Sequence, residues 1–169
     1  MQKIKFTVSI VGTLIMFYVM ATTGKPLITS TTPLGILNLE FAYNQQMVEQ
    51  ILNAWKNLID TALINTYWDF LYLFFYAFLL VNICTLIHHR LRATYGKIGL
   101  LFGRLAILAA FLDVIENGFM LNVLNNSYNA MSLQLMVGAS VLKWIIVLIV
   151  VLYSLVGLIL LTIRSLFPS

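Results

Sequence analysis

The sequence predicts an all-α integral membrane protein. We expect a four-helix bundle with an additional amphipathic helix at the membrane interface, in a long non-cytoplasmic loop. Of the 169 residues, 61% are hydrophobic and only 9% are charged, whereas about 25% are charged in an ordinary soluble domain. Four apolar stretches approach or exceed the length of about 20 residues that a spanning helix needs. Six acidic and ten basic residues are too few to solvate a globular surface. This scarcity excludes a soluble enzyme, a disordered chain and a free nucleic-acid binder.

The first apolar stretch, residues 6–22, follows Lys3 and Lys5 and has two interpretations. As a cleaved signal peptide it would have a basic start, an apolar middle and a small-residue cleavage site near Ala21. We favour a retained helix, because the apolar segment is at the long end for a signal peptide and no polar linker follows it immediately. The later spans keep the same orientation under both interpretations.

Three further spans complete a single transmembrane domain that covers residues 1–169. They are expected at about residues 67–87, 98–124 and 131–163. The last is longer than a bilayer requires, which indicates a tilted helix or one that partly leaves the membrane. The basic residues gather before the first span, between the second and third, and after the fourth. The positive-inside rule then places both termini in the cytoplasm, and we expect a bacterial inner membrane.

The long loop over residues 24–66 lies on the other side and has two parts. Residues 26–44 contain prolines, a glycine and a run of Thr and Ser, which indicates irregular structure. Over residues 45–63 the apolar positions recur at helical spacing, with Trp55 on the apolar face. This segment is predicted to be an amphipathic interfacial helix. It either covers the end of the bundle, which we favour, or acts as a lid or a partner-binding surface.

The third span carries the most informative polar residues, namely Asp113, Glu116 and Asn117. Because these positions lie three or four residues apart, their side chains project from one face of a helix. The same face continues through small residues to Gly103 and Gly99, a spacing that lets a neighbouring backbone approach closely. We therefore expect this face to be buried in the bundle. It also offers a seam for a second copy or for a membrane partner.

Lys143 in the fourth span is the expected partner of these carboxylates. A charge at mid-depth in a bilayer costs about 2.5–3.5 kcal/mol, so it needs either a partner or a function. Glu116 lies about eight residues before the end of the third span, and Lys143 about twelve residues into the fourth. At about 1.5 Å per residue their depths agree within two turns. We predict an ion pair between Lys143 and Asp113 or Glu116.

Asp69 lies near the outer end of the second span, and Tyr72 and Tyr76 continue its face. Asp69 could join the cluster from the outer side. Alternatively, it is a solvated carboxylate at a helix start, stabilised by the helix dipole, and we favour this second interpretation. We nevertheless keep all three residues in the candidate binding site. That site comprises Asp69, Tyr72, Tyr76, Asp113, Glu116, Asn117 and Lys143.

The basic residues near the cytoplasmic side form a second candidate site. Arg104 could simply extend its head to the headgroup region, or it could bind anionic lipid phosphates with its basic neighbours. The candidate headgroup ligands are Arg90, Arg92, Lys97 and Arg104. His88 and His89 are adjacent and point about 100° apart on a helix, so they are poor joint metal ligands. We assign no metal, no cofactor and no catalytic residue.

Three functions are compatible with these observations. The first is binding or conduction of a small polar ligand, an ion or a lipid headgroup at the buried acidic site, since carboxylates inside a membrane are functional by default. The second is a non-catalytic accessory or structural subunit, in which the same residues fix helix register. The third is a lipid-modifying enzyme that uses Asp113 or Glu116 as acid or base. We favour the first.

Overall fold

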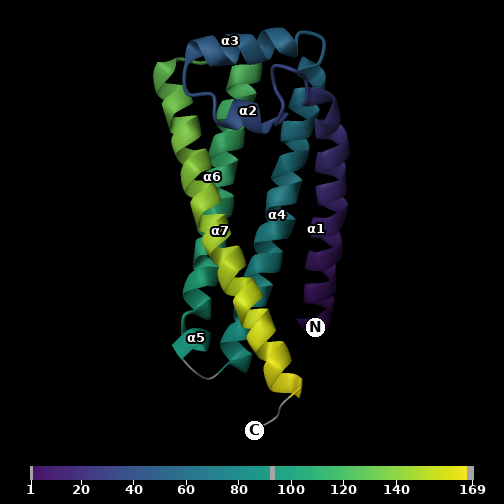
Figure 1. Ribbon diagram of the computed structural model, residues 1–169, viewed down its shortest axis with the longest axis vertical. Helices are drawn as coiled ribbons and strands as arrows, with labels where there is room; N and C mark the ends of the chain where they lie inside the picture. The colour runs from purple at the N-terminus through teal and green to yellow at the C-terminus, as the bar shows by residue number, and fades with distance from the viewer. Residues whose placement is uncertain (1, 92–93, 167–169) are drawn as a thin grey trace.

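The computed structural model describes residues 2–91 and 94–166, and this part of the chain contains helices and no strand. The long helices are α1 (Gln2–Gly24), α4 (Ile59–Arg90), α6 (Gly99–Leu124) and α7 (Ala130–Leu166). All four are long and apolar enough to cross a membrane (Figure 1). The all-α class and the four candidate spans expected from the sequence are therefore confirmed.

Short helices lie at both ends of this bundle. A 3₁₀ turn (Lys25–Leu27), α2 (Leu37–Glu40) and α3 (Gln45–Ala54) lie at one end, called here the α3 end. At the other, the α5 end, α5 (Thr94–Lys97) lies between α4 and α6 (Figure 1). Residues 26–44 were expected to be irregular. They are irregular except for the end of the 3₁₀ turn and the single turn of α2.

The loop helix is shorter than the sequence predicts. The chain turns between Trp55 and Leu58, where the Leu58 N–H donates to the Trp55 carbonyl over 2.6 Å. Residues 59–63, assigned to the amphipathic helix, instead form the first turn of α4. The four-residue turn is about as long as one helical turn. The apolar residues therefore keep their helical spacing across this turn, and the periodicity of the sequence did not reveal that the helix ends there.

The apolar side of α3 packs on the end of the bundle. The helix begins at Asn44, whose side-chain oxygen accepts the N–H of Met47 over 2.9 Å. Trp55, which follows α3, is fully buried and donates its indole N–H to the Leu27 carbonyl over 3.0 Å and to Thr32 Oγ1 over 3.1 Å. Side chains from the ends of α6 and α7 complete this core. The buried side chains of α3 thus pack against the ends of α6 and α7, and a role as a lid or partner-binding surface stays a prediction.

Helices α4, α6 and α7 meet closely at the α5 end. A Cβ at Gly157 of α7 would overlap the side chain of Ile87 of α4. A Cβ at Gly99 of α6 would lie 2.7 Å from the Cys84 carbonyl oxygen, and Gly103 also faces Cys84. The Gly99 and Gly103 face is therefore buried against α4 of the same chain. Within the described chain α4 occupies that face, and the seam for a second copy or for a membrane partner stays a prediction.

Helix α7 moves away from α4 toward the α3 end, as Figure 1 shows. Helix α1 packs along α4, and α6 packs along both α4 and α7. Among the long helices of the described chain, α1 and α7 share no extended contact. The separation leaves room between α1 and α7 in the half of the bundle nearest α3. The polar residues predicted from the sequence lie beside this space.

Candidate functional site: an acidic cluster beside a cavity

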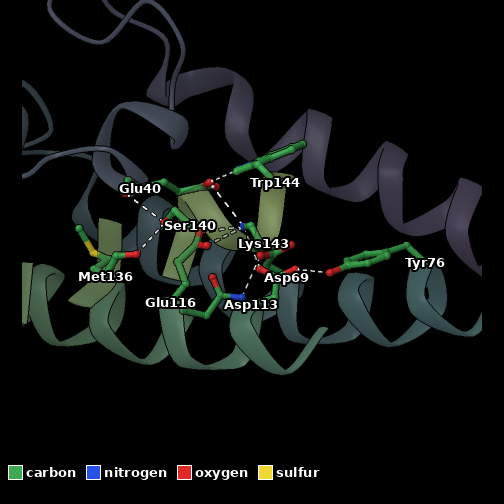
Figure 2. A network of polar contacts seen from close by, with 10 residues as sticks. Glu40, Asp69, Tyr76, Asp113, Glu116, Met136, Ser140, Lys143 and Trp144 are labelled. Atoms are coloured by element: carbon green, nitrogen blue, oxygen red, sulfur yellow. Dashed lines mark hydrogen bonds and ion pairs between the residues drawn. The ribbon is translucent and has the colours of Figure 1, made fainter. Parts of the chain in front are cut away.

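Lys143 is the centre of a buried ionic cluster (Figure 2). Its Nζ atom lies 2.8 Å from both carboxylate oxygens of Glu116 and 3.0 Å from Asp113 Oδ1. Glu40 Oε2 lies 3.5 Å from the same nitrogen. The depth argument predicted a pair with Asp113 or Glu116, and both pairs are present. The third carboxylate was not expected.

The spacing along α6 brings its polar side chains to one buried face. Asp113, Glu116 and Asn117 are 3%, 0% and 1% exposed, and Lys143 on α7 is 5% exposed. The small residues that precede them on α6, including Ala106 and Ala109, are fully buried. Close packing of α6 against its neighbours removes water from the charges, so each ion depends on protein partners.

Glu40 is the site residue that sequence reasoning missed. The sequence placed it in an irregular outer loop, but α2 folds back into the bundle and leaves Glu40 only 6% exposed. Its Oε2 atom accepts the indole N–H of Trp144 over 3.0 Å. Its backbone carbonyl accepts the Ser140 hydroxyl over 3.2 Å. These partners are about a hundred residues away along the chain, so no local pattern signals them.

Asp69 is half-buried beside the cluster and does not lie at a helix start, which corrects that part of the favoured interpretation. Helix α4 begins at Ile59, ten residues before Asp69. The Asp69 Oδ2 atom accepts a hydrogen bond from the side-chain amide of Asn117 over 2.8 Å. Within the described part of the chain it pairs with no cation, because the three ion pairs there all belong to Lys143.

The two tyrosines of α4 continue the polar surface. Tyr76 donates its hydroxyl to Asp113 Oδ2 over 2.8 Å (Figure 2). Tyr72 packs beside it, with ring centroids 5.5 Å apart and planes tilted by 59°. Asp113 therefore has Lys143 on one oxygen and Tyr76 on the other.

A cavity of about 560 Å³ adjoins this cluster. Its walls come from α1, the 28–40 segment, α4, α6 and α7. Glu40, Asp69, Asp113 and Lys143 all line it, as do both tyrosines, whereas Glu116 does not. The seven predicted binding residues thus lie together, and six of them face the cavity.

The cluster has more negative than positive groups. Three carboxylates share one lysine, and Asp69 adds a fourth carboxylate beside them, which leaves a formal charge of −3 when all are ionised. Glu116 contacts Lys143 through both oxygens. Three carboxylates line the cavity with two lysines, Lys143 and the exposed Lys25, so its polar lining is anionic on balance when the carboxylates are ionised. Among the described residues, no three His, Cys, Asp or Glu side chains are arranged to hold a metal ion.

The second candidate site remains separate from this one. Arg90, Lys97 and Arg104 are exposed at or near the α5 end, while Arg92 lies outside the described residues. The Arg90 carbonyl accepts a hydrogen bond from Arg164 over 3.2 Å. His88 Nδ1 bonds the Gly96 carbonyl over 3.0 Å, which ties α4 to α5. None of the described residues of this region lines the cavity.

The chain matches no known protein family, no curated protein and no solved structure.

Proposed function

We propose that this protein is a small polytopic membrane protein that binds a polar ligand or headgroup at the acidic cluster. The observation that carries the proposal is Asp69, a carboxylate that faces a cavity and forms no ion pair with the described residues. A charge within a membrane span is expensive, at about 2.5–3.5 kcal/mol at the centre of an isolated helix. A neutral Asn at this position would form one hydrogen bond with Asn117 at lower cost. Packing alone therefore does not account for the charge.

The proposed orientation follows the basic residues. The α5 end, with its exposed arginines and lysine, faces the cytoplasm, and both termini lie on that side. The α3 end then lies on the outer side of a bacterial inner membrane, with α3 at the interface. Under this orientation the cavity belongs to the outer half of the membrane.

An accessory or structural role is the second candidate, and the contact of Glu116 with Lys143 favours it. Glu116 is fully buried and does not line the cavity. It therefore suits a polar contact that fixes α6 against α7. The two candidate functions depend on different residues: the structural role depends on Glu116, and the binding role depends on Asp69.

The test compares Asp69→Asn with Glu116→Gln, and Asp60→Asn serves as the matched control. Asp60 is an exposed carboxylate on the same helix, nine residues earlier. Each protein is reconstituted in lipid nanodiscs, and retained small molecules are measured by native mass spectrometry. We expect Asp69→Asn to lose a species that the wild type and Asp60→Asn retain, with its unfolding unchanged to within about 1 kcal/mol.

Glu116→Gln should instead unfold more easily. Equal retention of every species by the wild type and Asp69→Asn would refute the binding role. It would leave the structural role as the better account.

A further inference from the structure

We infer that the ligand is a membrane amphiphile with an ammonium head group and an alkyl chain. This inference rests on the proposed binding function and adds the chemical class of the ligand. Three features of the cavity support it: the distribution of charge along its length, the position of its opening, and the aromatic residues beside the carboxylates.

The cavity changes from charged to apolar along the direction of the helices. Asp69 on α4 and Lys143 on α7 mark its polar part. Leu80, eleven residues further along α4, and Val151, eight residues further along α7, line the part nearer the bilayer centre. At 1.5 Å per residue, the apolar part continues for about 12–16 Å. One leaflet of a bilayer has the same order, with polar heads outside and alkyl chains inside.

The opening of the cavity faces the side of the bundle, where lipid would lie. The large apolar lining residues with high exposure are Phe17 on α1, Ile28 and Leu34 on the loop and Trp144 on α7, at 61%, 58%, 62% and 44%. They border the space between α1 and α7, two helices without extended contact. An amphiphile in the outer leaflet could thus enter sideways without leaving the membrane.

The head group is a cation because the polar wall is anionic. Glu40, Asp69 and Asp113 present carboxylates to the cavity. Two lysines also line it: Lys143, which contacts Glu116, Asp113 and Glu40, and Lys25, which is exposed at the loop side. A phosphate or carboxylate head would meet repulsion from all three, whereas an ammonium group would complete the charge balance. An ammonium group donates three hydrogen bonds, and Asp69 has one oxygen free of the bond from Asn117.

The aromatic residues beside the carboxylates suit the same head group. Tyr72 and Tyr76 line the cavity one and two turns beyond Asp69 on α4. A cation over a tyrosine ring is attracted by the ring electrons, most strongly where water is excluded. The carboxylates and aromatic rings therefore favour a cationic head group, and the apolar part of the cavity beyond them favours the alkyl chain of the ligand.

The test measures binding of a dodecylamine brominated along its chain, which quenches nearby tryptophan fluorescence. Trp144 lines the cavity and reports occupancy, and Trp144→Phe identifies its share of the signal. The brominated dodecanol of equal length carries no charge and serves as the matched ligand. Both are titrated into the whole protein in detergent micelles. We expect the amine to bind at least about tenfold more tightly than the alcohol.

The variants locate the head group. Asp69→Asn should weaken amine binding at least about tenfold, and Asp60→Asn should leave it unchanged. Equal binding of amine and alcohol to the wild type would overturn the inference. That comparison needs no variant, so it decides the question even where Asp69→Asn fails to fold.

Two further outcomes separate this inference from the proposed function. If ethylamine competes as effectively as dodecylamine, the ligand is a soluble amine and the membrane source is wrong. If the species retained through Asp69 in nanodiscs is neutral or anionic, the inference fails while the binding function stands.

Discussion

Lys143→Met tests whether the ionic cluster stabilises the fold through charge. Methionine keeps much of the length and apolar volume of lysine but removes the cation. Lys143 is 5% exposed, and its Nζ contacts Glu116 at 2.8 Å, Asp113 at 3.0 Å and Glu40 at 3.5 Å. Removal of one partner from a buried ion pair costs about 3–5 kcal/mol, because the remaining charge is left uncompensated. Here three carboxylates lose their cation, so we expect a loss in that range at neutral pH.

The assay is the free energy of unfolding in mixed micelles with increasing denaturing detergent. Lys97→Met is the control, because Lys97 is exposed at the α5 end, and it should change stability by less than about 0.5 kcal/mol. At acid pH the carboxylates take up protons and no longer need a cation. The deficit of Lys143→Met should therefore shrink as the pH falls.

A double-mutant cycle separates charge from shape. In Lys143→Met with Glu116→Gln, one uncompensated carboxylate is removed with the cation. The double variant should therefore lose less unfolding free energy than the two single variants lose in sum. Stability of Lys143→Met within about 0.5 kcal/mol of the wild type, or full additivity of the pair, would refute the reasoning.

Two further predictions concern the packing of the bundle, and both are measured as unfolding free energies in mixed micelles. Gly157→Ala places a Cβ against Ile87 and should destabilise by about 1–3 kcal/mol. Gly138→Ala, which meets nothing within 4 Å, should be neutral or stabilising by up to about 1 kcal/mol. Trp55→Phe loses the two hydrogen bonds of the indole N–H and should cost about 1–3 kcal/mol. Trp68→Phe, at a residue 43% exposed, should change little.

The outcomes that would contradict these two predictions differ. A neutral Gly157→Ala would mean that α4 and α7 adjust their distance freely at the α5 end. A neutral Trp55→Phe would mean that the segment after α3 is held by apolar contacts alone.

Much of the candidate site follows from the linear sequence, because helical periodicity is local. Asp113, Glu116 and Asn117 share a face since they are three or four residues apart, and residue depth in two antiparallel spans brought Lys143 to the same level. Such reasoning needs only the rise of a helix and the thickness of a bilayer. It extends to any side chain inside a predicted span.

The same reasoning failed for side chains near the predicted ends of spans. Asp69 was interpreted as a helix-start carboxylate because the apolar stretch begins at about residue 67, yet α4 begins at Ile59. Helix formation depends on backbone hydrogen bonds, whereas apolarity reports the environment of side chains. A polar first turn therefore belongs to the helix without appearing in the apolar pattern.

Composition and periodicity by themselves determined the all-α class, the four candidate spans and the polar face of α6. Only the tertiary structure decided that Glu40 returns from the loop to Lys143, that Gly99 and Gly103 pack on α4, and that a cavity separates α1 from α7. The physical reason is the range of the interactions. The helical period of 3.6 residues can be recognised from residues close together in the sequence. The return of Glu40, the packing of the glycines and the cavity depend instead on helices far apart in the chain and on the angles at which they cross.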